Sequence, residues 1–323
     1  MSMMIRTILT LMALAAVSAP AAAQYPSHPI KFVVSALPGA ATDILARVIA
    51  ERLSPRLGQP IIVENRSGAS STIAAGQVAK STPDGYMLMI SPNSLLIAPH
   101  MLPKGSGNVD VVNDLVPVAE LASTPIVLLA YPGLGVKNIQ EFLALAHRSP
   151  GLTYATGGTG SALHLSGELF QRSAGVKLTH VPYKGLAQAT TDVVAGTVNV
   201  MFGTPGGVMG EMINRGQLIP LAIADSNRSP LLPNVPTFRE AGIMGAELDA
   251  WFMMFAPSAT PPEIVARLNR EIAEVLTVPE VRTRLVAIGV SPKSESVERA
   301  AQIVRDDYKR YGEIVIHAGI GSR

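Results

Sequence analysis

The chain has 323 residues, with 26 Lys and Arg against 24 Asp and Glu, and it contains no cysteine. Without cysteine it can form no disulfide, thiolate metal site or cysteine nucleophile, and a net charge of +2 without a dense basic cluster argues against nucleic acid as a partner. The six histidines lack the H-x-x-x-H and H-E-x-x-H spacings of metal sites, so we expect no bound metal.

The N-terminal segment has the pattern of a secretory signal peptide. Arg6 precedes an apolar run over residues 8–19, and small residues follow at 21–23. We expect cleavage after Ala23 and export of the mature chain to the periplasm. No later run is long and apolar enough to predict a membrane span, and the mature length suits two domains.

Residues 25–122 alternate between strand and helix patterns. Strands are expected near 30–34, 61–63 and 86–90, with helices ending at 53 and covering 72–79. This βαβαβ order predicts a parallel sheet with right-handed crossovers. Between the first strand and helix, Pro38 and Gly39 break the pattern, and Thr42 is the expected N-cap of the helix.

A second α/β series covers residues 126–224, with expected helices over 139–147, 186–195 and 208–215. A short helix is then expected at 237–241 and one more strand at 251–255. A capping box at Thr260-Pro-Pro-Glu263 should open a helix to residue 276, with further helices over 279–288 and 297–316. Crossovers near Ser123 and Ala246 would form a double hinge, giving one discontinuous domain of residues 24–122 plus 247–323 and a second domain of residues 123–246.

Residues 152–170, LTYATGGTGSALHLSGELF, predict a strand, a glycine loop and a helix. Gly157, Gly158 and Gly160 allow positive φ, and backbone N–H groups at a helix N-terminus favour a small anion. Leu163 stands where a dinucleotide motif needs glycine, and no Gly-Lys-Ser/Thr follows, so we expect no nucleotide and no other cofactor. A tight strand-to-helix turn without a ligand is the alternative. Because residues 31–53 repeat the design, two facing lobes holding one ligand are favoured.

A serine hydrolase is the enzyme alternative. Ser161 and His164 lie three residues apart, and Asp43 would face them across a cleft. The chain has no G-x-S-x-G elbow, and a serine that opens a helix is usually a cap. We therefore expect no catalysis.

Ten segments, taken in order, resemble the periplasmic solute-binding proteins of tripartite tricarboxylate transporters, the Bug family. They include YPSHPIKFVV, PGAATDILAR, LGQPIIVENRSGA, YATGGTGSALHLSGELF, HVPYKGLAQATTDVVAGTVNVMF and WFMMFAPSATP. The resemblance implies a two-lobed α/β Venus-flytrap fold of type II, in which each lobe is a mostly parallel sheet flanked by helices. It also implies a monomer that captures a small carboxylated solute and delivers it to membrane permease subunits. A periplasmic sensor partner that presents bound ligand is the alternative role.

The resemblance also assigns ligand-binding positions. Carried over residue by residue, they fall in the two loops that close on the carboxylate, in the VPYKG segment and after a later strand: Leu37, Gly39, Ala40, Thr42, Asp43, Thr156, Gly157, Gly158, Ser161, His164, Tyr183, Lys184 and Thr204.

Two departures from the family pattern affect the ligand. Ser35-Ala-Leu-Pro-Gly-Ala40 stands where the family commonly has Pro-Phe-Pro-Pro-Gly-Gly, so an aromatic wall is missing. Thr204 lies where many relatives carry an acidic or amide residue, which disfavours an amino-acid ligand. Both loops are nearly free of Lys and Arg, so the anion should be held by backbone N–H groups and by the hydroxyls of Thr42 and Ser161.

Overall fold

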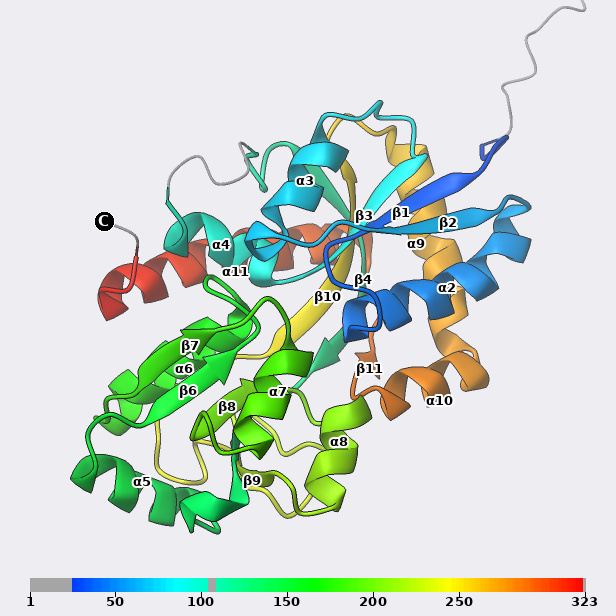
Figure 1. Cartoon of the computed structure of the whole chain (residues 1–323). Coiled ribbons are helices and arrows are strands. Elements are labelled where there is room, and N and C mark those ends of the chain that lie inside the picture. Colours follow the sequence, from blue (N-terminus) through cyan, green and yellow to red (C-terminus); the bar gives the residue numbers. More distant parts are fainter. Residues whose placement is uncertain (1–24, 104–108, 322–323) are drawn as a thin grey trace, which may run out of the picture.

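The computed structural model describes residues 25–103 and 109–321, so the predicted signal peptide lies outside the described residues. Two β-sheets, each covered by helices on both faces, lie one above the other in Figure 1. Strands from residues 30–124 and 250–292 form one sheet, and strands from residues 127–223 form the other. The chain therefore enters the second sheet once and returns to the first.

The first sheet has six strands in the order β11-β4-β10-β3-β1-β2. Their bounds are Ser291–Pro292 (β11), Leu115–Thr124 (β4), Ala250–Pro257 (β10), Met87–Pro92 (β3), Ile30–Val34 (β1) and Ile61–Asn65 (β2). Strand β1 pairs in parallel with β2 and β3, which confirms the predicted βαβαβ unit. The long strand β4 was not predicted, and β10 is antiparallel to both of its neighbours because it returns from the second sheet.

Alternating side chains of β10 supply both faces of the first sheet. Phe252 and Met254 belong to a core with α2 (Ala41–Leu57), α9 (Pro262–Thr277) and α10 (Pro279–Ala287). Met253 and Phe255 point the other way, into a core shared with three further helices. Those helices are α3 (Thr72–Ala79), α4 (Ser94–Met101) and α11 (Val297–Ala318). The near absence of polar residues in β10 reflects burial on both faces.

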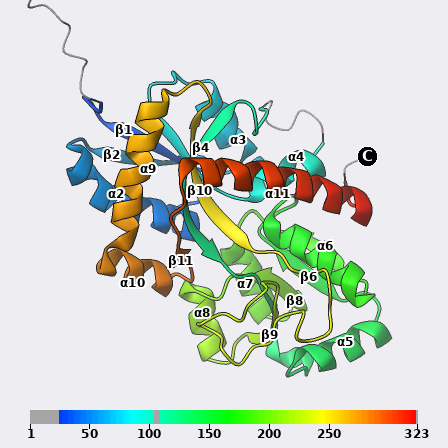
Figure 2. The ribbon, with the colours of Figure 1, turned by 180° about the vertical axis from the view of Figure 1, so that it is seen from behind.

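The second sheet has the order β7-β6-β8-β5-β9, and only β5 runs antiparallel to its neighbours. The strands are Thr179–Pro182 (β7), Thr153–Thr156 (β6), Val200–Gly203 (β8), Val127–Ala130 (β5) and Ile219–Ile223 (β9). Helices α5 (Ile139–Arg148) and α6 (Ala162–Ala174) cover one face, and α7 (Leu186–Val194) and α8 (Gly207–Asn214) cover the other. The core on the α6 face is continuous with that of α4 and α11. The back view shows α6 lying beside α11 (Figure 2).

The two crossings between the sheets lie side by side. Ala224 N–H donates to Ile126 O at 2.8 Å, and Leu248 N–H donates to Ala224 O at 2.7 Å. Residues 125–126 and 224–249 thus form adjacent connections, as a hinge requires.

Two local predictions in the returning segment were wrong. Residues 237–241 form a turn rather than a helix, because Gly242 at φ 83° ends the segment after one turn. The N-cap of α9 is Pro261 without a side-chain bond, since the Thr260 hydroxyl donates to Pro257 O at 2.7 Å. No capping box therefore forms there.

Candidate functional site

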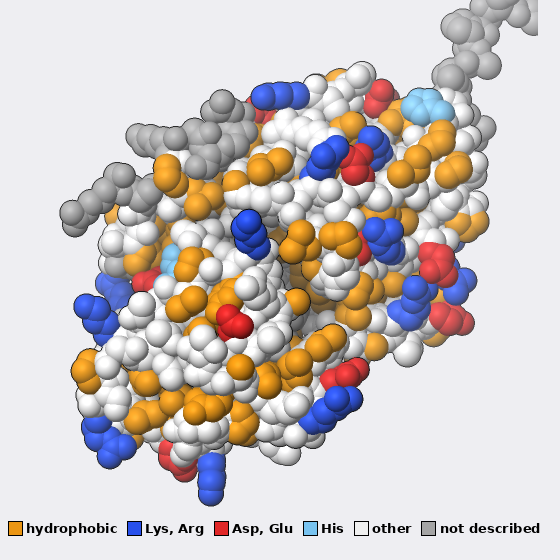
Figure 3. Space-filling model, viewed as in Figure 1, with side chains coloured by type: hydrophobic (Ala, Val, Ile, Leu, Met, Phe, Trp, Pro, Cys, Tyr) orange, Lys and Arg blue, Asp and Glu red, His pale blue; other side chains and the backbone are white. Residues whose placement is uncertain are grey.

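A cleft of about 680 Å³ lies between the two sheets. Its walls are loops at the carboxyl ends of parallel strands: residues 35–40 after β1, 67–71 after β2, 157–161 after β6 and 183–186 after β7. Figure 3 shows the hollow between the two halves of the molecule, with hydrophobic side chains around it. In open α/β sheets, ligands bind outside the carboxyl ends of the strands. The strand order reverses there, and neighbouring loops leave a crevice between them.

Seven of the residues assigned from the sequence line the cleft: Leu37, Ala40, Gly157, Gly158, Ser161, Tyr183 and Lys184. The other six lie behind its walls or away from it: Gly39, Thr42, Asp43, Thr156, His164 and Thr204. The structure therefore brings the two predicted loops and the VPYKG segment together around one space. It places several of their polar side chains where they support the walls.

The start of α2 differs from the prediction. Ala40, not Thr42, is the N-cap, and it makes no side-chain cap bond. The Thr42 side chain is buried in the first turn and does not line the cleft. Since Ala40 does line the cleft, α2 begins at the cleft without a capping side chain.

Asp43 holds the first loop from behind. Its carboxylate accepts from Gly39 N–H at 2.9 Å, from Asn65 Nδ2 at 2.9 Å and from Arg47 Nε at 3.0 Å. Burial alone would raise the pKa of Asp43, but the hydrogen bonds from Arg47, Gly39 and Asn65 and the positive charge of Arg47 together lower it. Asp43 is thus an ionised brace for the loop, and its charge is compensated by Arg47.

The loop at residues 67–71 was not assigned from the sequence. Ala69, Ser70 and Ser71 have φ values of 43°, 47° and 83°, a left-handed run that is costly for residues with a Cβ. Ser70 Oγ donates to Thr159 O at 2.6 Å and so bridges the two sides of the cleft. The run Gly-Ala-Ser-Ser directly after a strand was the signal available in the sequence.

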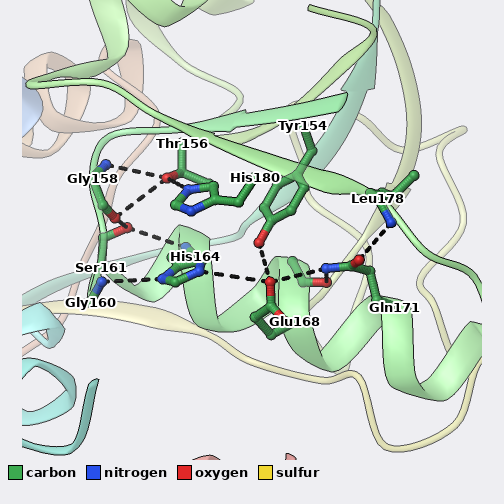
Figure 4. Close-up of polar contacts among 11 residues, drawn as sticks. Tyr154, Thr156, Gly158, Gly160, Ser161, His164, Glu168, Gln171, Leu178 and His180 are labelled. Atoms are coloured by element: carbon green, nitrogen blue, oxygen red, sulfur yellow. Dashed lines mark hydrogen bonds and ion pairs between the residues drawn. The ribbon is translucent and has the colours of Figure 1, made fainter. Parts of the chain in front are cut away.

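The glycine loop is held by side chains beneath it (Figure 4). Gly158 N–H donates to Thr156 Oγ1 at 3.2 Å, and Gly160 N–H donates to His164 Nδ1 at 3.2 Å. These two donors are therefore used within the protein, contrary to the expectation that the glycine N–H groups converge on a ligand. Among the described residues, no partner takes the N–H groups of Gly157 and Thr159.

Ser161 is the N-cap of α6, as expected for a serine that opens a helix. Its hydroxyl accepts from His164 N–H at 3.2 Å and donates to Gly158 O at 2.7 Å. The hydroxyl proton is therefore engaged in the loop itself. Among the described residues, no hydrogen bond joins the Ser161 hydroxyl to the His164 ring, and Asp43 lies in its own network, so the catalytic triad drawn from the sequence is not formed.

Two stacked imidazoles lie under the glycine loop. The rings of His164 and His180 are 3.9 Å apart at 11°, and His180 Nε2 lies 2.7 Å from Thr156 Oγ1. Burial lowers the pKa of His164 to about 4, and burial together with the nearby His164 lowers that of His180 to about 4. Because His164 is neutral at pH 7, its 3.7 Å approach to Glu168 Oε1 is a contact of a neutral ring rather than an ion pair. Tyr154 donates to the same carboxylate oxygen.

Tyr183 and Lys184 follow β7 and line the cleft next to the glycine loop. The Tyr183 hydroxyl donates to Asp192 Oδ2 at 2.6 Å, and burial, followed by this bond, raises its pKa to about 12. Lys184 is the only charged residue among the described residues that line the cleft.

No group of three or more His, Asp or Glu in the described part of the chain could hold a metal ion. None of the described helices is long and apolar enough to cross a membrane.

Comparison with known proteins identifies the family. The family described as tripartite tricarboxylate transporter family receptor matches residues 45–320. The chain belongs to this family. BugT of Bordetella pertussis is 35% identical over 321 residues, covering 99% of this chain and 98% of the relative. The predicted resemblance is thereby confirmed.

Solved structures of similar proteins confirm the predicted two-lobed α/β fold of periplasmic binding proteins. A protein of R. palustris with adipate is 34% identical, with a TM-score of 0.86 over 92% of this chain and 99% of the other. MatC from Rhodopseudomonas palustris with bound malate is 33% identical, with a TM-score of 0.81 over 90% and 100%. The periplasmic binding protein BugD is 29% identical, with a TM-score of 0.84 over 93% and 100%.

Proposed function

We propose that this chain captures a small carboxylated solute in the cleft, in the periplasm, and delivers it to the permease of a tripartite tricarboxylate transporter. The observation that carries the proposal is the open start of α2. Ala40 lines the cleft and makes no side-chain cap bond, so the first N–H groups of the helix are oriented for an anion.

The lining of the cleft supports the same ligand class. No Asp or Glu is among the described lining residues, and Lys184 adds one positive charge. Gly157 and Thr159, whose N–H groups have no partner among the described residues, line the cleft on the side of the second sheet. A volume of about 680 Å³ suits a small organic acid. Two relatives with solved structures hold adipate and malate, both dicarboxylates.

The lobes that would close on this solute are proposed to be residues 24–122 plus 247–323 and residues 123–246. The sheet membership of β4, β5, β9 and β10 supports crossings close to these boundaries, at residues 125–126 and 224–249. Ligand that contacts the loops of both lobes would stabilise the closed arrangement, because it binds that arrangement more tightly.

A thermal-shift series tests ligand capture. Mono-, di- and tricarboxylates are compared with their methyl esters, which keep the carbon skeleton but remove the charge. A ligand at 100 times its Kd should add about 2.7 kcal/mol to the free energy of unfolding. If no acid stabilises the mature protein, or if an ester stabilises it equally, the proposal is wrong.

Delivery to a permease needs a cellular test. Uptake of the identified acid, in radiolabelled form, is measured in cells that lack this chain, the permease subunits, or both. Loss of uptake in each single deletion supports delivery. Uptake that depends on the permease alone would assign this chain another role, such as presenting ligand to a sensor.

A further inference from the structure

A second cavity, of about 600 Å³, lies on the flank of the molecule between α6 and α11. Figure 2 shows these two helices beside each other. The connection through residues 239–247 forms its third side, and no residue lines both cavities. We call it the arginine groove, after Arg172, Arg239 and Arg310 in its walls.

The three arginines come from three different segments. Only Arg239 forms an ion pair with a carboxylate, although Asp307 lies close enough to Arg310 for the two charges to attract each other. Arg239 Nε donates to Glu247 Oε1 at 2.8 Å. Arg310 NH2 instead donates to the backbone oxygen of Glu247 at 3.1 Å, and Arg172 NH1 donates to the backbone oxygen of His317. Among the described residues, no carboxylate lies within ion-pair distance of Arg172 or Arg310.

One backbone bond holds each of these two exposed guanidinium groups and leaves it without a carboxylate at ion-pair distance. A carbonyl accepts one N–H and leaves the planar fork with further donors, which match the two oxygens of a carboxylate. Glu313 is the other acid of the groove, but it is exposed and its closest cation is Lys309 at 3.9 Å. The lining therefore keeps an excess of positive charge, three arginines against Glu247 and Glu313.

The apolar residues of the groove determine which kind of group the ligand carries beside its carboxylate. Leu169 of α6 and Ile314 of α11 line the groove together with the arginines and offer apolar contact. A ligand that fits both features carries a carboxylate on a short apolar stem. The groove joins elements of the two sheets. Arg172 lies near the end of α6, which follows a strand of the second sheet and begins at the cleft with Ser161, whereas α11 packs on β4 of the first sheet.

We propose that the arginine groove is a second binding site, specific for a carboxylate on a short apolar stem, which it holds between Arg172 and Arg310. The carboxylate is either that of a free organic acid or that of a glutamate in a partner protein. Binding at this site does not depend on the function proposed for the cleft.

Two probes distinguish the sources: glutarate, and a short blocked peptide of alternating Leu and Glu. The peptide with Gln in place of Glu is the charge control. Binding is followed by isothermal titration and by the Nε–Hε signals of the arginine side chains in ¹H–¹⁵N spectra. These signals report the groove even if glutarate also enters the cleft.

The variant is Arg172→Gln with Arg310→Gln, and the matched control is Arg215→Gln, an exposed helix-end arginine outside the groove. We expect the signals of Arg172 and Arg310 to shift with at least one probe. The affinity of that probe for the groove, followed in the double variant by the signal of the remaining groove arginine, Arg239, should fall about tenfold. The control should keep the affinity, and high salt should weaken it.

Shifts with the peptide alone assign the site to a protein partner, and shifts with glutarate assign it to a free acid. The proposal is overturned if neither probe moves the arginine signals, if the Gln peptide binds equally well, or if the double variant binds as tightly as the wild type. Single Arg310→Gln protein repeats the test if the double variant loses its fold.

Discussion

Acidification should destabilise this protein through the histidine pair beneath the glycine loop. Protonation of His164 at Nδ1 would replace an acceptor with a donor that faces Gly160 N–H. The rings of His180 and Tyr154 stack on the His164 ring, and Glu168 is the one acid in contact with it among the described residues. The perturbation is His164→Asn, because an Asn oxygen can occupy the position of Nδ1 and accept the same N–H without titrating.

The change in the free energy of unfolding with pH follows from the difference between the pKa values of His164 in the folded and the unfolded chain. The pKa of His164 is about 4 in the folded protein, below the ordinary imidazole value of 6.5 that applies to the unfolded chain. Its contribution to stability is therefore complete above pH 6.5 and is lost as the pH falls from there toward 4. Between pH 7.5 and pH 5 the loss for such a shift is about 2 kcal/mol. His180 should add less, because it is more exposed and its proton is coupled to that of His164.

The assay is urea unfolding of wild-type protein, His164→Asn and the control His147→Asn at pH 7.5 and 5. His147 is exposed at the end of α5, outside the pair. The wild type and the control should lose about 2 kcal/mol more than His164→Asn over this interval. Titration of Asp and Glu is common to all three proteins and cancels in the difference. An equal loss in His164→Asn would refute the assignment of the effect to this ring.

Four further outcomes are expected. Gly158→Val should weaken ligand binding more than tenfold, or by more than about 1.4 kcal/mol, because φ of Gly158 is 136° and the new Cβ would lie 3.4 Å from Tyr183 O. The control Gly135→Val, also at positive φ but with open space around it, should keep the affinity in the same titration. Lys184→Ala should weaken binding by only about 1 kcal/mol if backbone N–H groups hold the carboxylate; loss of all binding, together with a steep salt dependence, would show that the lysine dominates. Asp43→Asn should lower the free energy of unfolding by about 1 to 3 kcal/mol by breaking the brace on the first loop, as urea titration can measure against the exposed Glu51→Gln. Saturating ligand should reduce the radius of gyration in small-angle scattering, and confirmed binding without that change would argue against hinge closure.

Local pattern was sufficient for most of the elements. Apolar residues at helical spacing predicted α3 at its observed bounds, and Ser161 caps α6 as a serine that opens a helix usually does. The sequence failed where a neighbour in space decides the outcome. Strand β4 carries Pro117 and Glu120 and looks irregular by itself, yet pairing with β10 along its whole length makes it a strand.

The same division applies to the site. The sequence alone determined that two strand-loop-helix units exist and that their loops could meet an anion, because glycine spacing and helix starts are local properties of the chain. Only the tertiary structure decided which groups are left for a ligand. Gly158 and Gly160 donate to Thr156 and His164, so their N–H groups are already used. The strained run at residues 69–71 became part of the cleft because contacts with Ser35 and Thr159 hold it there. Hydrogen-bond partners are set by residues far apart in the chain, and no local pattern specifies them.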